Sequence, residues 1–302
     1  MEVKKNSAKA WFLASRPKTL SGAAVPVLIG LALAYTDARD YEGNVFSWTA
    51  AVLCLVFAFI MQIDANFVND FIDYARGTDD RTTRLGPERA CAQGWIDTDN
   101  MKHAIAATTC LACVVGLPLV LFGGLEMILV GLFCVVFCFL YTSHLSYIGL
   151  GDVLVLVFFG IVPVCTTYYV QLHEVPLHVF AASFACGIVV DALLLVNNFR
   201  DRDTDRLAGK KTLVIRIGPQ ATLWLYLFTG VTACLTGCLV FLPTHHMLAA
   251  LLPMFYLALH VTTWLKMKSI WQGRELNACL GATARNIFIY GISVVLGLLS
   301  GI

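Results

Sequence analysis

The stretch that decides the fold is Asn66-Phe-Val-Asn69-Asp70-Phe-Ile-Asp73-Tyr-Ala-Arg76-Gly77-Thr-Asp79-Asp80, which begins where a long apolar run ends. Asn69 and Asp73 have the spacing that places two side chains on one face of a helix. Farther along, Asp201 and Asp205 repeat this spacing within Asn197-Asn198-Phe-Arg200-Asp201-Arg202-Asp203-Thr-Asp205. Carboxylates so placed repel each other unless a cation or solvent screens them. The two stretches therefore predict metal ligands, and Mg²⁺ is the ion that we expect.

The composition is that of an integral membrane protein. Of 302 residues, 58% are hydrophobic and 14% are charged, and the mean hydropathy is +0.75. A soluble domain carries about 25% charged residues. Apolar runs of about 20 residues can cross a bilayer, and we count nine of them, at 19–38, 46–66, 103–122, 124–142, 150–170, 177–197, 221–242, 246–265 and 283–301. Only Gly123-Gly124 separates the third run from the fourth, so counts of eight or ten stay open.

Positive charge falls on one side of this predicted topology. With nine crossings and a cytoplasmic N-terminus, every one of the 21 Lys and Arg residues except Arg39 lies in a cytoplasmic segment. We therefore expect a multi-pass protein of the inner (cytoplasmic) membrane, with the N-terminus and both acidic stretches in the cytoplasm. The first apolar run has no convincing cleavage site and is interpreted as a span. The 11 cysteines lie mostly within predicted helices, and no disulfide is expected.

The chain is expected to form a single membrane domain over residues 1–302. Residues 1–18 form a basic interfacial segment, and 69–102 and 198–220 are the predicted cytoplasmic catalytic loops. The long connection at 74–102 favours a lid over the site. Lys18 either anchors the chain at lipid headgroups or reaches an anionic substrate, and Arg16 is the weaker of these two candidates.

Polar side chains within the apolar runs indicate a cavity. The end of the second run is rich in Asn, Asp and Gln, a density that lipid would not tolerate unless the residues face an internal space. Asp191 lies within the sixth run, on the helical face of Asn198. An intramembrane aspartate is a functional candidate, although it could instead be a buried group that is protonated or paired with an arginine.

Acidic edges, surrounding cations and a lipid-buried cavity together predict a site for a polyanion on an apolar tail, such as a prenyl diphosphate. The candidate metal ligands are Asn69, Asp70, Asp73, Asp201 and Asp205. The candidate substrate-binding residues are Lys18, Asn66, Arg76, Arg84, Asn198, Arg200 and Lys210. The candidate catalytic residues are Asp73, Asp191, Asp201 and Asp205.

These residues resemble a known family. The pattern Asn69-x-x-x-Asp73, the segment Arg84-Leu-Gly-Pro87, and Asn197-Asn198-x-Arg200-Asp201-x-x-x-Asp205-x-x-x-Gly209-Lys210-x-Thr212-Leu213 resemble the aspartate-rich motifs of the UbiA superfamily of intramembrane prenyltransferases. Arg16-Pro-Lys-Thr-Leu20, Gly149-Leu-Gly-Asp152, Phe158-Phe-Gly160 and Tyr168-Tyr-Val-Gln171 resemble its MenA branch, which prenylates 1,4-dihydroxy-2-naphthoate in menaquinone synthesis. The resemblance covers nearly the whole chain.

The resemblance implies an all-α membrane bundle of nine helices around a central cavity, Mg²⁺ dependence, and transfer of a polyprenyl group to an aromatic ring. It also implies that Asn69, Asp73, Asp201 and Asp205 hold Mg²⁺ and diphosphate, while Arg200 and Lys210 contact phosphate. Gly77 stands where many superfamily members have a further Asp, and Asp79 and Asp80 are the nearest acidic residues. The expected partners are a polyprenyl diphosphate, an aromatic acceptor and membrane lipid, and no nucleic acid.

Other functions stay open. The same fold could prenylate 4-hydroxybenzoate, homogentisate or haem. An ion-coupled transporter would use Asp64, Asp191 and the acidic edges for cations or protons, but acidic residues beside many cations at one membrane face favour a phosphorylated substrate. A lipid-headgroup transferase is disfavoured, because its metal aspartates would be expected in one continuous motif.

Overall fold

The fold is a bundle of long helices. A computed structural model describes residues 3–40, 45–77, 84–244 and 246–300. Within these ranges all regular structure is helical, and nine segments are long and apolar enough to cross a membrane. They are Ala8–Asp37, Trp48–Ala75, Thr98–Gly123, Glu126–Leu145, Gly151–Leu172, Leu177–Leu207, Pro219–Phe241, Met247–Ile270 and Leu276–Leu299. The predicted count of nine is confirmed, and the protein is a multi-pass membrane protein.

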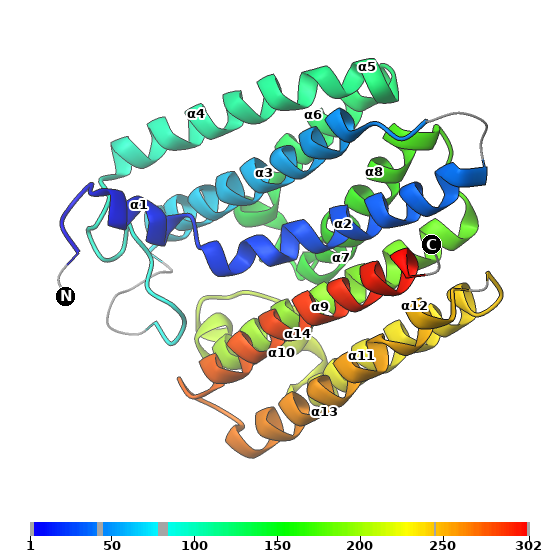
Figure 1. Cartoon of the computed structure of the whole chain (residues 1–302). Helices are drawn as coiled ribbons and strands as arrows, with labels where there is room; N and C mark the ends of the chain where they lie inside the picture. Colours follow the sequence, from blue (N-terminus) through cyan, green and yellow to red (C-terminus); the bar gives the residue numbers. More distant parts are fainter. Residues whose placement is uncertain (1–2, 41–44, 78–83, 245, 301–302) are drawn as a thin grey trace.

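Figure 1 shows the long helices side by side, with the N-terminus at one end of the bundle and the C-terminus toward the other. In chain order the helices are α1 (Ala8–Ala14), α2 (Leu20–Asp37), α3 (Trp48–Ala75), α4 (Thr98–Gly116), α5 (Val120–Gly123), α6 (Glu126–Leu140), α7 (Gly151–Leu156), α8 (Val162–Leu172), α9 (Leu177–Leu207), α10 (Leu213–Ile217), α11 (Pro219–Phe241), α12 (Met247–Leu251), α13 (Pro253–Ile270) and α14 (Leu276–Leu299). The 3₁₀ turns are η1 (Pro17–Thr19), η2 (Ala38–Asp40) and η3 (Leu117–Leu119), and the π-helical turns are η4 (Tyr141–Leu145) and η5 (Val157–Ile161).

Local sequence explains the breaks between helices. Gly124 has a φ of +77°, which favours glycine, and it separates α5 from α6 at the turn predicted from Gly123-Gly124. Arg16 precedes Pro17, a position where helical backbone is disfavoured, and with a φ of +51° it ends α1 before η1 begins. Both breaks therefore follow from residues whose backbone preferences are known.

Two helices are longer than the hydropathy predicted. The apolar runs end at 66 and 197, but α3 continues to Ala75 and α9 to Leu207. The first parts of both predicted catalytic loops, 69–75 and 198–207, are therefore helical. A polar helix end keeps its backbone hydrogen bonds, so it can extend beyond the apolar segment. The acidic motifs thus sit on two rigid helix ends.

Helices α2, α8, α9, α11 and α14 form the main hydrophobic core, in which small residues permit close packing. Gly160 of η5 lies against Gly187 of α9, where an added Cβ would approach the Gly187 Cα to 2.5 Å. Helices α4 and α6 lie at the periphery, since only 17% and 6% of the most apolar windows of their spans are buried. Much of their surface is therefore left for lipid.

A cavity of about 1170 Å³ lies between α2, α3, α4, α6, α7, α8, α9 and the start of α14. Its walls are mostly apolar, and its polar lining residues gather at the end where α3 and α9 carry the acidic motifs. Among the residues that the structure describes, none from α11 to α13 lines it. The cavity is therefore displaced to one side of the bundle, with α11 to α13 on the other.

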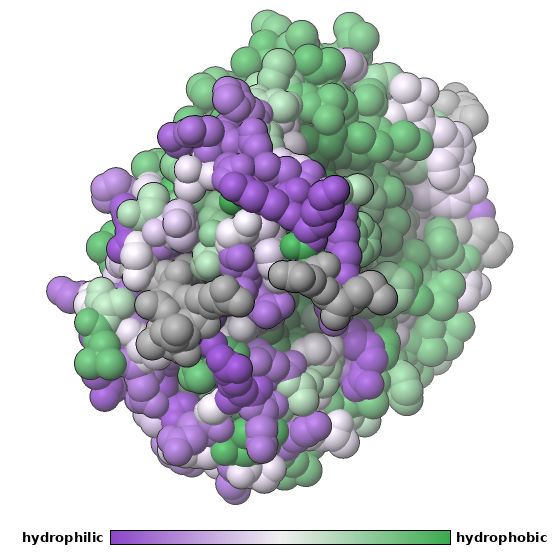
Figure 2. Space-filling model, turned by 90° about the vertical axis from the view of Figure 1, so that its left-hand side faces the viewer, coloured by the Kyte–Doolittle hydropathy of each residue, from purple (hydrophilic) through white to green (hydrophobic). Residues whose placement is uncertain are grey.

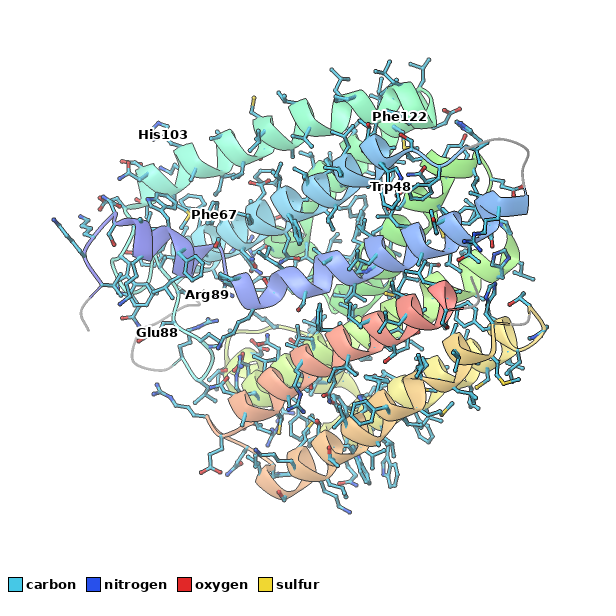
Figure 3. The ribbon with its side chains drawn as sticks, viewed as in Figure 1. Trp48, Phe67, Glu88, Arg89, His103 and Phe122 are labelled. Atoms are coloured by element: carbon cyan, nitrogen blue, oxygen red, sulfur yellow. The ribbon has the colours of Figure 1, made fainter. Side chains whose placement is uncertain are left out.

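Hydrophilic residues gather at the end of the bundle that carries the N-terminus, while the flanks are largely hydrophobic (Figure 2). Figure 3 places Glu88 and Arg89 at this same end, in the connection between α3 and α4, and Trp48 and Phe122 toward the opposite end. Of this connection, residues 78–83 lie outside the described ranges, and so do Asp79 and Asp80. Its later part lines the cavity through Arg84, Glu88 and Arg89, and the expected lid over the site stays a prediction.

Candidate functional site

The first acidic edge is the end of α3. Asn69 lines the cavity, and Asp73, one turn later, is buried. Arg89 Nη2 lies 3.4 Å from Asp73 Oδ2. Arg89 belongs to the connection that follows α3, so this connection supplies the cation that pairs with Asp73. Asn69 and Asp73 thus share one helical face, as the sequence predicted, but Asp73 is already paired with a cation.

Asp70 serves a different purpose from Asp73. Its Oδ2 accepts a hydrogen bond from the Ala90 backbone N–H at 2.8 Å, and its Oδ1 accepts one from the Cys91 N–H at 3.0 Å. The side chain is only 1% exposed. Both carboxylate oxygens of Asp70 thus bond to backbone N–H groups, and they hold the turn that follows Arg89. We therefore favour a structural role for Asp70 over metal binding.

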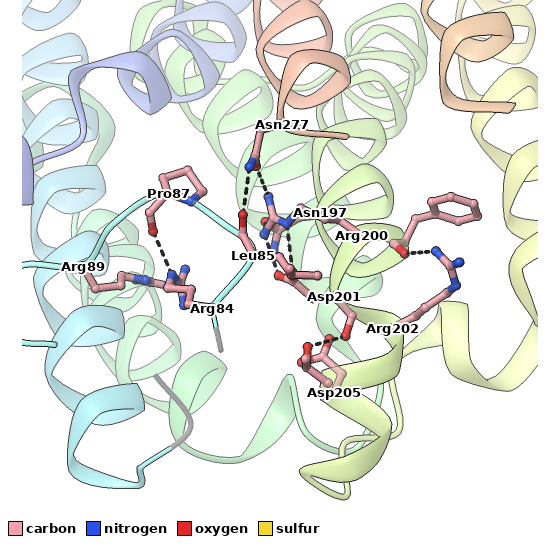
Figure 4. A network of polar contacts seen from close by, with 12 residues as sticks. Arg84, Leu85, Pro87, Arg89, Asn197, Arg200, Asp201, Arg202, Asp205 and Asn277 are labelled. Carbon is pink, nitrogen blue, oxygen red and sulfur yellow. Dashed lines mark hydrogen bonds and ion pairs between the residues drawn. The ribbon is translucent and has the colours of Figure 1, made fainter. Parts of the chain in front are cut away.

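The second acidic edge is the end of α9, where Arg200 organises a network (Figure 4). Arg200 Nε donates to Asp201 Oδ1 at 2.8 Å, and Nη2 donates to Asp201 Oδ2. Nη2 also donates to Asn197 Oδ1, and Nη1 donates to Asn277 Oδ1, both at 2.8 Å. A fork of this kind fixes both the position and the orientation of the Asp201 carboxylate.

The same network holds the part of the α3–α4 connection that lines the cavity. Asn277 Nδ2 donates to the Leu85 carbonyl at 2.8 Å, and Arg274 donates to the Arg84 carbonyl at 3.0 Å. Gly86 packs directly on Arg200, because an added Cβ would lie 2.5 Å from Arg200 Nη2. The Arg84-Leu-Gly-Pro87 segment is therefore tied to α9 and α14.

The predicted phosphate contact of Arg200 does not fit this arrangement. Its side chain is fully buried, and its guanidinium group donates hydrogen bonds to Asp201, Asn197 and Asn277. We therefore assign Arg200 to positioning Asp201 and, through Asn277, the Arg84-Leu-Gly-Pro87 segment.

Lys210 joins the two acidic edges. Its Nζ lies 3.1 Å from Asp205 Oδ1, and the Asp73 carboxylate also acts on it electrostatically. Burial lowers the pKa of Lys210, but Asp205 and Asp73 outweigh burial and hold this pKa above its ordinary value. A lysine that responds to carboxylates from both α3 and α9 indicates that the two motifs converge.

Tyr147 supports this convergence from the turn after α6. The guanidinium of Arg76 lies 4.8 Å from the centre of the Tyr147 ring, and Lys210 Nζ lies 5.2 Å from it. The Lys211 N–H donates to the Tyr147 carbonyl at 2.8 Å. Arg76 is exposed and stacks on this ring, and its predicted contact with substrate stays a prediction.

The mouth of the cavity is lined by cations. Arg84 and Arg16 both line it, and Lys18 lies exposed at its rim. Burial lowers the pKa of Arg84 to about 10, and the positive charge of Arg16 is the second cause of this shift. The nearby Asp201 carboxylate acts in the opposite direction but is outweighed. Arg16 Nη2 is buried without a hydrogen-bond partner in the described part of the chain. Cations held in this way gain from an anion that binds at the mouth.

Three predicted residues are placed differently. Asn66 lines the cavity, but its Nδ2 donates to the Ser15 carbonyl at 2.9 Å, so it also anchors the chain that leads to η1. Asn198 and Asp191 are buried and lie off the cavity wall. The α9 residues that reach the cavity are instead Val190, Leu193, Leu194 and Asn197.

Sequence reasoning left three residues out of the candidate set. Arg16 is the weaker candidate beside Lys18 on sequence alone, although its position before Pro17 is a signal for a fixed, non-helical backbone. The candidate set contains Asn198 and not its neighbour Asn197, and only the helical phase separates the two. Asn277 gave no signal, because its partners Leu85 and Arg200 are remote in sequence.

The donor set suits magnesium bound together with a phosphate. In the described ranges, no three His, Cys, Asp or Glu side chains converge as a self-contained metal site. Mg²⁺ usually takes one or two carboxylates, with phosphate and water oxygens as its other ligands. Asn69 and Asp73 on one edge, and Asp201 and Asp205 on the other, provide hard oxygen donors of this kind.

Comparison with known proteins agrees with this geometry. A sequence model of the UbiA prenyltransferase family matches residues 23–290. The chain belongs to this family. Two similar relatives are the 1,4-dihydroxy-2-naphthoate octaprenyltransferases of Escherichia coli (strain K12), 36% identical over 70% of this chain and 69% of the relative, and of Mycobacterium tuberculosis (strain ATCC 25618 / H37Rv), 35% identical over 72% of each. As a family member, the protein is a prenyltransferase.

Solved structures share the fold. A UbiA homolog from Archaeoglobus fulgidus bound to DMAPP and Mg²⁺ has a TM-score of 0.65 and 16% identity, covering 94% of this chain and 98% of its own. The apo UbiA homolog from Aeropyrum pernix K1 has a TM-score of 0.68 and 14% identity, covering 93% and 97%. The likeness therefore extends over nearly the entire bundle.

Proposed function

We propose that this prenyltransferase transfers a polyprenyl group from its diphosphate to 1,4-dihydroxy-2-naphthoate, with loss of CO₂, in menaquinone synthesis. The observation that carries the proposal is the convergence of two acidic helix ends, each with its own cations, beside a large apolar cavity that Asn69 and Asn197 line. The acceptor comes from the names of relatives that are about one-third identical in sequence. The A. fulgidus homolog, bound to DMAPP and Mg²⁺, supports the donor and the metal.

The cavity suits the donor. Its volume of about 1170 Å³ exceeds the ~300–1,000 Å³ typical of small-molecule sites, which leaves room for a prenyl chain and an aromatic ring. Phe137, Phe158 and Phe159 line it and contribute to an apolar wall. Such a wall excludes water from an allylic cation that would otherwise be hydrolysed.

The polar residues at the mouth would hold the leaving group. Asn69, Asp73, Asp201 and Asp205 would hold Mg²⁺ with the diphosphate, and bound Mg²⁺ would neutralise phosphate charge and make diphosphate a better leaving group. Arg84 and Lys210 would donate to the remaining phosphate oxygens. Because these groups are fixed before the reaction, they stabilise negative charge as it grows in the transition state.

The membrane placement remains part of the proposal. A single membrane domain over 1–302, oriented with the polar end in the cytoplasm of the inner membrane, fits the bias of Lys and Arg toward that end. Soluble naphthoate would then reach the site from the cytoplasm, and the prenyl chain would come from the bilayer.

The test is a direct assay. Purified protein is incubated with a polyprenyl diphosphate, 1,4-dihydroxy-2-naphthoate and Mg²⁺, with EDTA as the control, and products are identified by mass spectrometry. We expect a prenylated, decarboxylated naphthoquinol that disappears with EDTA and in Asp73→Asn and Asp201→Asn variants. Product with 4-hydroxybenzoate or homogentisate, but none with the naphthoate, would refute the acceptor. Wild-type turnover by either variant would refute the assigned site.

A further inference from the structure

Two carboxyl groups lie where α7 packs against α9, and of these Asp191 is buried and Asp152 is half-buried. Asp152 is at the start of α7, and Asp191 is in the middle of α9. The Oδ1 atom of each is buried and has no hydrogen-bond partner in the described chain. The Asp152 carboxyl acts electrostatically on Asp191. The helices meet closely here, since a Cβ added at Gly151 would lie 3.3 Å from Leu194 Cδ2.

This pair differs from the metal-site carboxylates. Asp73, Asp201 and Asp205 each have an Arg or Lys partner, whereas within the described ranges neither Asp152 nor Asp191 has one. Two neighbouring carboxylates without a cation are costly to ionise together, because their repulsion and the loss of hydration act in the same direction. A pair of this kind is suited to sharing a proton, as paired carboxyls in other enzymes do.

Tyr141 borders both the cavity and the start of α7. Neither aspartate lines the cavity, but Tyr141 does. Its hydroxyl oxygen lies 3.8 Å from the position of a Cβ on Gly151, the residue before Asp152. Both aspartates act on it electrostatically. The Tyr141 hydroxyl makes no hydrogen bond within the part of the chain that the structure describes, and it is therefore available to a ligand.

We propose that Asp152 and Asp191 form a proton-holding pair that serves the aromatic acceptor through the hydroxyl of Tyr141. This inference rests on the proposed function and adds a proton carrier to it. Tyr141 touches the cavity contents, while the two aspartates act through Tyr141. The pair lies deeper in the bundle than the metal-binding edges, since Asp191 precedes Asp201 by almost three turns of α9.

The proposed step is balanced. The ring carbon that bears the carboxylate bonds to the prenyl carbon as the carbon–oxygen bond to diphosphate breaks. The proton of the neighbouring ring hydroxyl passes through Tyr141 to the carboxyl pair, and this leaves a ring ketone. The carbon–carboxylate bond then breaks, CO₂ departs, and its electron pair restores the aromatic ring as a phenolate. The pair returns the proton through Tyr141, so no external base or oxidant is consumed.

The test compares Asp152→Asn, Asp191→Asn, the double variant and Tyr141→Phe in the quinol-forming assay. General acid–base catalysis contributes about 10²–10⁴-fold, so we expect each variant to lose at least about 10²-fold in kcat. The KM for prenyl diphosphate should stay unchanged, because the diphosphate end is untouched. Since the aspartates act as one unit, the double variant should lose no more than either single variant. Asp191→Glu, which keeps the carboxyl, should recover most of the rate.

Asp64→Asn is the matched control. Asp64 is also a buried intramembrane carboxyl, but it accepts hydrogen bonds from the hydroxyls of Thr108 and Thr109, and it does not line the cavity. We expect its kcat to remain near that of the wild type. This control shows whether loss of any buried carboxyl impairs the protein through folding alone.

The outcomes separate the two proposals. If the wild-type protein forms no quinol from the naphthoate, the proposed function fails. If the wild-type protein turns over and the Asn variants match its rate, the proton-holding pair is refuted. Multiplicative losses in the double variant, losses equal to those of Asp64→Asn, or no recovery in Asp191→Glu would also refute it, since a packing role predicts these results.

Discussion

Replacing Arg200 by lysine separates a positioning role from a phosphate contact. Lysine keeps the charge but cannot reproduce a fork that reaches Asp201, Asn197 and Asn277 at once. At least two of these hydrogen bonds should be lost. At about 1.5–3 kcal/mol for each bond to a charged group, the free energy of unfolding should fall by about 3–6 kcal/mol.

The same change should weaken metal binding indirectly. Arg200 orients the Asp201 carboxylate, and loss of a group that orients a metal ligand typically costs about 10–100-fold in metal affinity. We therefore expect the Mg²⁺ concentration for half-maximal transfer to rise by about 10–100-fold. Activity should recover in large part at saturating Mg²⁺. The assay is quinol formation across a Mg²⁺ titration, combined with unfolding in mixed micelles.

Arg202→Lys is the matched control. Arg202 is a buried arginine on the same helix, but it donates to the carbonyls of Phe199 and Trp271 and points away from Asp201. It should lose stability without any change in the Mg²⁺ requirement. If Arg200→Lys instead raises the KM for prenyl diphosphate while its stability and Mg²⁺ requirement stay at wild-type values, Arg200 contacts phosphate and the positioning role is wrong.

Three further changes test the neighbouring contacts. Asp70→Asn should lower the free energy of unfolding by about 1.5–3 kcal/mol, because a carboxylate that accepts hydrogen bonds from two backbone N–H groups is lost. The Mg²⁺ titration should stay unchanged, and a shifted titration would show that Asp70 is a metal ligand. Gly86→Ala should raise the Mg²⁺ requirement in the same direction as Arg200→Lys, because its Cβ meets the guanidinium, and a wild-type titration would contradict that contact. The pKa of Lys210 is raised, so its stabilising pair with Asp205 is complete below the unfolded value of about 10.4 and is lost only as pH rises through the higher folded value. The loss of stability in Lys210→Met should therefore be constant from about pH 6 to about pH 9, and chemical denaturation at several pH values would expose any decline in this window.

The sequence predicted those features that depend on local pattern. Nine spans follow from apolar runs, and the shared faces of Asn69 with Asp73 and of Asp201 with Asp205 follow from helical spacing. These properties need no knowledge of what the helix meets. The extension of α3 and α9 beyond the apolar runs was missed, because hydropathy detects where lipid contact ends and not where a helix ends.

Partner choice could not be predicted from the sequence. Asp70 and Asp73 are chemically identical and nearly share a helical face. Asp70 nevertheless accepts hydrogen bonds from the backbone of residues 90 and 91, whereas Asp73 pairs with Arg89. Asn277 joins Leu85 to Arg200 across most of the chain. Such contacts depend on how loops close over the bundle, and no spacing rule describes them.

The pairing of acidic residues changes how the motif works. Spacing alone describes Asp201 and Asp205 as a repulsive pair that needs a metal, but each already has a cation, Arg200 or Lys210, and Asp73 has Arg89. These cations lower the attraction of the carboxylates for a free divalent ion. A diphosphate reverses this, because it adds oxygen ligands for Mg²⁺ and negative charge for Lys210 and for Arg84 at the cavity mouth. The arrangement therefore favours joint binding of Mg²⁺ and diphosphate over binding of either one alone. The cations that flank the motif contribute to this binding as directly as the aspartates do.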